Sequence, residues 1–371
     1  MHTQSSAKDS VSVIIPCYNY AQYLPRAIES ALEQARASLE VEVIVVDDGS
    51  TDATASVAKE YGTRIRYIYQ ENKGLSGARN TGIREAKKDF VLFLDADDLL
   101  AKNNLEKQLL NFKRNPSLDI SVCLSVLTDD PFARPLQGSL FPLKAKHLDL
   151  HLCNSNIAPV HSFLVRRHVL ERCGFFDETL PACEDQDYWR RCAVAGCTFA
   201  ATTETSTYYL QHEDSLSRRL GQQLESDTKM NFLISKALDE CPDFPRAGKY
   251  YGWLAHAAGL LDSALFNEAV ELEACKKLAQ EGGFSLMRAL SEPRLIEEEY
   301  LSYCEEYYIT KIVVILRNLK NRPPLLQKAI KLLFAERKPF LKAKDDVLEH
   351  KIEVLNKKIC CELPTNLAMI L

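Results

Sequence analysis

The stretch Val41-Glu-Val-Ile-Val-Val-Asp-Asp-Gly-Ser50 decides the fold class, because an apolar β-type run ends directly in acidic and turn-forming residues. The same pattern occurs on either side of it: Val11 to Ile15 runs into Pro16-Cys-Tyr-Asn19, and Phe90 to Leu94 runs into Asp95-Ala-Asp-Asp98. In an open parallel α/β sheet, ligands bind outside the carboxyl ends of the strands. The polar residues that follow these three runs are therefore expected at one binding edge.

The segments between these runs predict an alternating α/β chain. Apolar residues at helical spacing predict helices at 21–40, 52–61 and 74–87, and a further strand at 64–69. The resulting order, β-α-β-α-β-α-β, implies a parallel sheet with right-handed crossovers.

The rest of the chain predicts a second half of this domain and then a helical region. Strands are expected at 118–126, 161–164 and 198–210, helices at 104–115, 167–173 and 184–195, and a long loop at 128–146. After Ser217 the periodicity is almost wholly helical. We therefore expect a catalytic α/β domain at 1–217 and a helical domain at 218–371.

Composition and charge exclude several classes. The 371 residues are 46% hydrophobic and 26% charged, as in ordinary globular proteins, and the net charge of −5 argues against a nucleic-acid partner. Met1 to Ser10 lacks the apolar region of a signal peptide, and no apolar run approaches the roughly 20 residues that span a bilayer. The 12 cysteines form no CxxC pair and no zinc-type spacing. We expect a protein of the reducing cytoplasm.

Two acidic clusters follow the strands, and each has two interpretations. Asp47 and Asp48 are typical of a turn and helix cap, or one of them binds the ring of a nucleoside. The carboxylates of Asp95 to Asp98 either cap a helix near Leu99 to Gln108, or bind Mg²⁺ or Mn²⁺ together with diphosphate oxygens. Three carboxylates in four positions repel one another, which favours the metal.

A third cluster, Glu184-Asp-Gln-Asp-Tyr-Trp189, is typical of an acidic first helical turn, or it supplies a general base for an acceptor hydroxyl. His212 is either a surface residue or a metal or diphosphate contact. Lys73 and Arg79 flank a glycine-containing turn and either serve helix solvation or contact phosphate.

In order and spacing these motifs resemble the inverting family 2 glycosyltransferases of the GT-A fold. The resemblance covers about residues 11–217, and its matching stretches are 11–19, 45–52, 72–82, 93–98, 174–178, 184–190 and 209–212. It implies a Rossmann-like, mostly parallel sheet flanked by helices, and an enzyme that moves a sugar from a nucleotide-diphosphate donor, most often a UDP-sugar, to an acceptor hydroxyl.

The resemblance also implies roles for individual residues. Asp185 would be the catalytic base, with Glu184 and Asp187 as near alternatives, and Trp189 would pack behind the helix or line the acceptor site. Asp97 and His212 would bind a divalent metal (Mn²⁺ or Mg²⁺), with Asp98 as an alternative ligand. The nucleotide sugar would contact the following residues: Pro16, Tyr18, Asn19, Asp48, Lys73, Arg79 and Asp95.

Two other enzyme classes require motifs that this sequence lacks. A nicotinamide-dependent dehydrogenase needs GxGxxG after the first strand, and a P-loop phosphotransferase needs GxxxxGK[ST]; the sequence has neither. A non-catalytic nucleotide-sugar-binding module of a glycan assembly complex stays open. The expected acceptor is a cell-surface polysaccharide or glycolipid.

For the helical region, packing and homo-oligomerisation are favoured. A second hypothesis places the basic, apolar stretch Lys311 to Lys344 on the anionic inner face of the membrane as a peripheral contact.

Overall fold

The computed structural model describes residues 8–128, 148–149, 152, 156–212, 230, 233–236, 253–254, 256–261 and 272–291. The chain divides into two compact units, Met1–Ser226 and Asp227–Leu371, and each is described here by itself. The predicted loop beyond Thr128 and the basic stretch Lys311 to Lys344 lie outside the described residues. The boundary at 217/218 stays a prediction.

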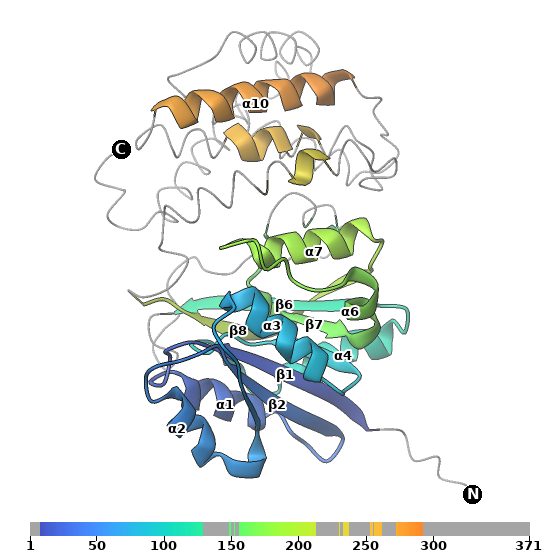
Figure 1. Cartoon of the computed structure of the whole chain (residues 1–371). Coiled ribbons are helices and arrows are strands. Elements are labelled where there is room, and N and C mark those ends of the chain that lie inside the picture. The colour runs from blue at the N-terminus through green and yellow to red at the C-terminus, as the bar shows by residue number, and fades with distance from the viewer. Residues whose placement is uncertain are drawn as a thin grey trace, which may run out of the picture. The chain divides into compact units, whose positions relative to one another are not determined.

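The first unit is built on one eight-stranded sheet with the order β3-β2-β1-β4-β7-β6-β8-β5 (Figure 1). The strands are β1 (Asp9–Cys17), β2 (Leu39–Asp47), β3 (Arg66–Tyr69), β4 (Phe90–Phe93), β5 (Leu99–Leu100), β6 (Ile120–Thr128), β7 (Phe163–Arg166) and β8 (Phe199–Leu210). Strands β1 to β4 pair in parallel, as predicted. Strand β7 runs antiparallel to both of its neighbours, so the whole sheet is mixed.

Helices cover both faces of this sheet (Figure 1). They are α1 (Leu24–Leu32), α2 (Thr54–Glu60), α3 (Gly74–Glu85), α4 (Asn104–Arg114), α6 (Arg167–Cys173) and α7 (Glu184–Val194). One core lies between the sheet and α1, α2 and α4, and the other between the sheet and α3, α6 and α7. The parallel strands alternate between these cores, which is why both faces of β1 are apolar.

Helix α3 approaches the sheet closely. A Cβ added to Gly82 would lie 2.2 Å from Cγ2 of Ile14 on β1, so only glycine permits this packing distance. Gly49, in the loop after β2, has a φ of +79°, and its Cβ would lie 2.9 Å from the backbone nitrogen of Asn72. Gly82 thus lets α3 pack closely on β1, and Gly49 lets the loop after β2 lie against Asn72, just before α3.

Two sequence predictions of helices are corrected. The helix predicted at 21–40 ends at Leu32, and β2 already begins at Leu39. The alternative in which Asp95 to Asp98 cap a helix that begins near Leu99 is also excluded, because Leu99 and Leu100 pair with Tyr208 and Thr207 of β8. Tertiary strand pairing overrides the local pattern there, and the next helix, α4, begins at Asn104. The Asp95 to Asp98 cluster therefore does not cap a helix.

In the second unit the described residues include the helix α10 (Leu272–Ser291) and shorter helical stretches. The guanidinium of Arg288 lies 4.5 Å from the ring centroid of Trp253, and Nδ1 of His256 lies 3.1 Å from Oγ of Ser285. None of the described helices has the length and apolar character that a membrane span requires.

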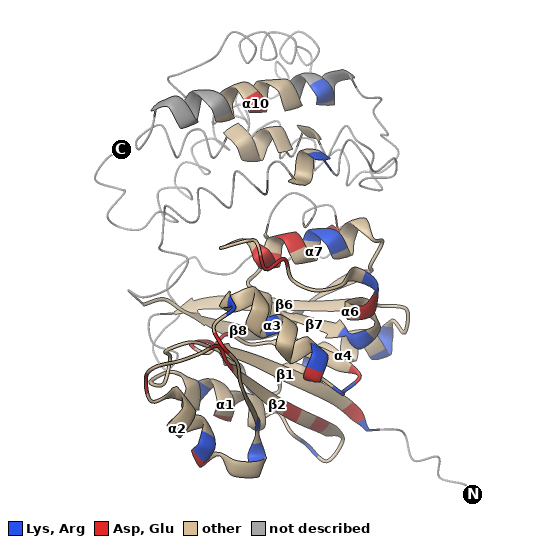
Figure 2. Cartoon of the chain, viewed as in Figure 1, with Lys and Arg blue, Asp and Glu red and all other residues tan. Residues whose placement is uncertain are grey.

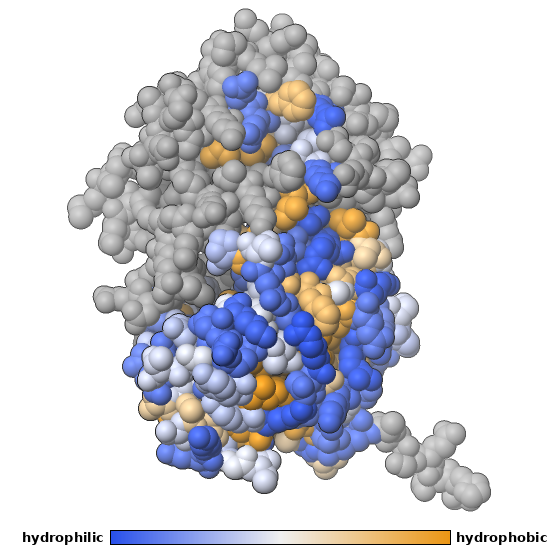
Figure 3. All heavy atoms as spheres, in the orientation of Figure 1, coloured by the Kyte–Doolittle hydropathy of each residue, from blue (hydrophilic) through white to orange (hydrophobic). Residues whose placement is uncertain are grey.

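Much of the described surface on one face is hydrophilic, with apolar residues in small patches (Figure 3).

Candidate active site

The end of β2 places two buried aspartates at the carboxyl edge of the sheet. Asp47 accepts hydrogen bonds from the Ser50 backbone N–H (2.9 Å) and from the Tyr67 hydroxyl (2.6 Å), which fixes the turn after the strand. Asp48 accepts on one oxygen, Oδ1, from Gln70 Nε2 (2.6 Å) and the Lys73 backbone N–H (2.9 Å). Asp47 is thus a turn residue, whereas Asp48 links β2 to the start of α3.

The loop after β1 is joined to the loop after β2. Oδ1 of Asn19 accepts from the backbone N–H groups of Thr51 (2.8 Å) and Asp52 (3.3 Å), and Asn19 itself has a left-handed φ of 56°. Tyr18 is 46% exposed beside this junction, and Pro16 is buried within β1. The side chain of Asn19 therefore holds the loops, while the ring of Tyr18 is available to a ligand.

The Asp95 to Asp98 segment follows β4 and divides into three environments. Asp95 accepts a hydrogen bond from Arg79 Nη2 at 2.7 Å. Asp97 Oδ2 lies 2.9 Å from Nε2 of His212, the predicted metal partner. Asp98 is fully buried, accepts from the Leu210 backbone N–H at 2.9 Å, and lies 2.7 Å from Nδ1 of His161. One short stretch thus serves three separate contacts.

Burial and mutual repulsion raise the affinity of this cluster for positive charge. Burial, together with the charges of Asp98 and Asp95, raises the pKa of Asp97 to about 7. Burial also raises the pKa of Asp98. Burial lowers the pKa of His161, but the adjacent Asp98 carboxylate outweighs this and leaves the pKa above its usual value. A buried acid with a raised pKa is a site where a cation would replace a proton.

Two sets of described residues could ligate a metal here. Asp95, Asp98 and His161 present ligand atoms within 4.8 Å of one another, but the side chains of Asp98 and His161 are 0% exposed and already pair with each other at 2.7 Å. Asp98 also accepts from the Leu210 backbone N–H. The side chains of Asp97 and His212 are 15% and 12% exposed. Carboxylate oxygen and imidazole nitrogen both suit Mn²⁺, so the partly exposed Asp97 and His212 pair could also ligate such an ion.

Arg79 joins this motif to a distant helix. Its side chain is 1% exposed, and its two terminal nitrogens donate to Asp95 (2.7 Å) and to Glu184 Oε1 (2.5 Å), the first residue of α7. In Figure 2 the ribbon at the start of α7 has the red colour of Asp and Glu. The guanidinium also lies 5.4 Å from the ring centroid of Phe176. The structure places Arg79 between two carboxylates, and its predicted donor contact stays a prediction, as does that of Lys73, whose side chain is exposed.

The predicted base, Asp185, lies beside this bridge. Its Oδ2 accepts from Asn156 Nδ2 at 2.8 Å, and its Oδ1 accepts from the Gln186 backbone N–H at 2.7 Å. Burial and the neighbouring Glu184 raise the pKa of Asp185 to about 6, against the lowering effect of Arg79. Asp187 instead pairs with Arg190 (2.8 Å) and Arg191 (2.7 Å). This makes Asp185 the carboxylate suited to proton exchange.

Several residues at the site were not assigned a role from the sequence. The sequence placed both Asn156 and His161 in a segment, 154–161, that is expected to help select the acceptor, and gave neither residue a role of its own. In the structure His161 contacts Asp98, and Asn156 contacts Asp185. Trp189 is 0% exposed and stacks on Phe163 with ring centroids 4.1 Å apart, so it belongs to the core behind α7. These contacts join residues that are far apart in the sequence, so no local sequence pattern predicts them.

Comparisons with known proteins identify the family and the fold. The glycosyl transferase family 2 model matches residues 12–174. An uncharacterized glycosyltransferase of Rickettsia typhi is 32% identical over 244 residues, which cover 62% of this chain and 70% of that protein. Another, of Rickettsia prowazekii, is 31% identical over 237 residues, or 60% and 68% of the two chains.

A solved structure shares the fold. Residues 1–349 of S. aureus TarS superpose with a TM-score of 0.61 at 20% identity, covering 82% of this chain and 90% of that one. The expected α/β class with a GT-A-like sheet is therefore confirmed for the first unit, and the all-helical character of 218–371 stays a prediction. The family model matches residues 12–174, and the chain is 32% identical to the Rickettsia typhi glycosyltransferase, of which it covers 70%. The chain therefore belongs to glycosyltransferase family 2 and is a glycosyltransferase.

Proposed function

We propose that this protein is an inverting, metal-dependent glycosyltransferase that moves a sugar from a UDP-sugar to an acceptor hydroxyl in cell-surface polysaccharide or glycolipid synthesis. The observation that carries the proposal is the Arg79 bridge. It ties Asp95, in the donor motif, to Glu184, which precedes the candidate base Asp185. Donor and acceptor chemistry thus meet at one buried ion-pair network.

The donor would lie along the carboxyl edge of the sheet. Asp48 and the exposed ring of Tyr18 offer a hydrogen-bond acceptor and a stacking face for a nucleobase, and Pro16 and Asn19 would complete the pocket. Asp95 would contact the ribose. TarS, which shares the fold, has been solved with UDP and with UDP-GlcNAc at TM-scores of 0.58 and 0.61, which makes UDP-sugars the first donors to test.

Asp97 and His212 would hold the divalent metal. When bound there, the metal neutralises charge that develops on the departing diphosphate. His212 is fixed for this role by stacking on Tyr23, with ring centroids 4.7 Å apart, and by its contact with Asp97. The chain's own residues thus orient the ligand atoms before the donor arrives.

Asp185 would take the proton of the acceptor hydroxyl as that oxygen attacks the anomeric carbon. A pKa of about 6 leaves the carboxylate largely ionised at neutral pH, yet close enough to accept a proton efficiently. Asn156 holds one carboxylate oxygen in place. With one base and no second carboxylate assigned as a nucleophile, a single displacement inverts the anomeric centre.

The wider setting is part of the same proposal. The reaction would take place in the cytoplasm or at the inner face of the membrane, and the helical region 218–371 would serve oligomerisation, acceptor binding or membrane contact.

A thermal-shift panel of UDP-, GDP- and dTDP-sugars, each with and without Mn²⁺, tests this proposal. A ligand that binds only the native state at a hundred times its Kd adds about 2.7 kcal/mol of stability. We expect a rise in Tm with a UDP-sugar that depends on Mn²⁺ and is lost in Asp97→Asn. A shift with GDP- or dTDP-sugars alone, or an equal shift without metal, would reject the proposed donor or the proposed metal dependence.

The acidic cluster also predicts a pH dependence of stability. The folded-state pKa of Asp97, about 7, lies above an unfolded value of about 3.9, so between these values only the folded state holds the proton. The free energy of unfolding of the metal-free protein should therefore fall as the pH rises across this window. Asp185 adds to this fall in the free energy of unfolding between its unfolded pKa of about 3.9 and its folded pKa of about 6.

Urea unfolding at several pH values measures this slope. In Asp97→Asn the decline nearest pH 7 should disappear, and saturating Mn²⁺ should suppress it in the wild type, because the metal replaces the proton. An Asp97→Asn protein with the wild-type slope would contradict the assignment.

A further inference from the structure

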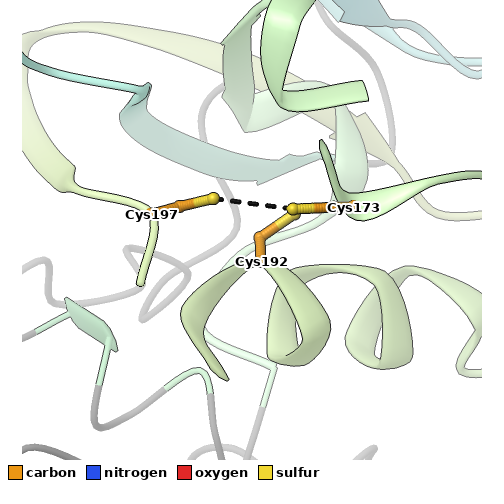
Figure 4. Close-up of side chains that lie close together, drawn as sticks. All are labelled: Cys173, Cys192 and Cys197. Atoms are coloured by element: carbon orange, nitrogen blue, oxygen red, sulfur yellow. Dashed lines mark hydrogen bonds between the residues drawn. The ribbon is translucent and has the colours of Figure 1, made fainter. Parts of the chain in front are cut away.

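Three cysteines from separate elements meet at the C-terminal end of α7, the end opposite its acidic first turn. Cys173 ends α6, Cys192 lies near the end of α7, and Cys197 precedes β8 (Figure 4). Their sulfur atoms all lie within 4.8 Å of one another, and those of Cys173 and Cys197 are 3.6 Å apart. Cys192 and Cys197 are 0% and 3% exposed, and Cys173 is partly exposed.

This cluster corrects an expectation from the sequence. The scattered cysteines showed no spacing typical of zinc sites, because the intervals between residues 173, 192 and 197 match no short metal motif. Folding nevertheless brings the sulfurs together, since α6 and α7 pack side by side and the turn after α7 returns the chain to the sheet. The backbone N–H of Cys197 donates to the Cys192 carbonyl at 3.0 Å, which fixes that turn.

Positive charge lies next to the sulfurs. Nη2 of Arg172 donates to Cys197 Sγ at 2.6 Å and to Asp119 Oδ2 at 3.1 Å. A guanidinium this close to the sulfurs favours the thiolate, the form of cysteine that binds metals.

We propose that Cys173, Cys192 and Cys197 bind a thiophilic divalent metal, Zn²⁺ being the expected ion, through their three sulfurs. A Zn–S distance of about 2.3 Å in a tetrahedron separates the sulfurs by roughly 3.8 Å, close to the observed 3.6 Å. A solvent molecule takes the fourth position. Three thiolates and one dication leave a single negative charge, which Arg172 faces. Binding releases the protons that the thiols still hold.

The sulfur site would stabilise the helix that carries the candidate base. Asp185 lies in the first turn of α7 and Cys192 in its last turn, so a metal there would pin the opposite end of the helix to α6 and to β8. This site differs in ligand chemistry from the Asp97 and His212 pair, because it offers sulfur atoms where that pair offers oxygen and nitrogen. The inference does not depend on the proposed sugar transfer.

Co²⁺ titration of the full chain, stripped with a chelator and kept reduced with a phosphine, tests this site. Binding through thiolates produces an intense ultraviolet charge-transfer band, which oxygen and nitrogen ligands do not give. We expect one equivalent of Co²⁺ to develop the band and Zn²⁺ to displace it. An Asp97→Asn background, which disables the other site, should leave the band intact.

Matched variants identify the ligands. Cys173→Ser and Cys197→Ser should each weaken Co²⁺ binding by at least about 100-fold, because loss of an outer-shell partner alone costs about 10- to 100-fold. Cys123→Ser, which alters a buried free cysteine on β6, should bind as the wild type does. Circular dichroism checks that each variant is folded.

Two results would overturn the proposal. The first is a reduced, folded wild-type protein that develops no thiolate band with Co²⁺. The second is a purified protein in which two of the three cysteines form a disulfide, seen as a 2 Da mass difference on reduction, and which takes up no metal after reduction. The latter would instead make the cluster a redox pair.

Discussion

Replacing Asp185 with asparagine is expected to lower kcat by about 10²- to 10⁴-fold, the usual contribution of a general base, while the Kd for the donor stays unchanged. Asparagine has the same shape and keeps an oxygen that can accept from Asn156, so the loss isolates proton transfer. Release of UDP from the UDP-sugar found by the thermal-shift panel measures turnover, and the same panel measures donor binding.

Asp187→Asn is the matched control, because Asp187 lies in the same helical turn but pairs with Arg190 and Arg191. It should lower the free energy of unfolding more than it lowers kcat. If Asp185→Asn turns over normally and Asp187→Asn does not, the base has been assigned to the wrong carboxylate. If the wild-type protein binds the donor but shows no turnover, the variants have no activity to lose. The chain then acts as a binding module.

Arg79→Met is expected to destabilise the first unit by about 3–5 kcal/mol, the cost of removing one partner from a buried ion pair. Methionine fills much of the space, but Asp95 and Glu184 would lose their shared partner in a buried site. Urea unfolding measures the loss. The control is Arg64→Met, which breaks the exposed pair with Glu29 and should change stability little.

A second measurement on the Arg79→Met protein is its pH–rate profile, which would stay unchanged if Arg79 had only a structural role. Arg79 lowers the pKa of Asp185, so its loss should shift the acid limb of the pH–rate profile to higher pH. Arg79→Lys, which keeps the charge but can satisfy fewer acceptors, should retain more of the wild-type profile. An unchanged free energy of unfolding and an unchanged profile in Arg79→Met would show that the bridge does not connect the two motifs.

The first four strands and their helices follow from the sequence because their signals are local. Helix α1 buries Leu24, Ala27, Ile28 and Ala31 at helical spacing. Its end was predicted too late because no glycine or proline marks the turn at 33–38. Strand β5 lies where one interpretation of the acidic cluster placed the start of a helix, near Leu99 to Gln108. Its pairing with β8, more than 100 residues away, excludes that interpretation.

The sequence alone determined the parallel α/β half of the sheet, the acidic residues at its carboxyl edge and the family that these motifs resemble. Hydrophobic periodicity and turn chemistry act over a few residues, so they can be read from a short window. Only the tertiary structure decided that Arg79 joins Asp95 to Glu184, that Asp98 is buried against His161, and that three scattered cysteines meet. These contacts depend on how the helices and strands pack, because the partners of a buried charge or thiol are chosen by the space around it.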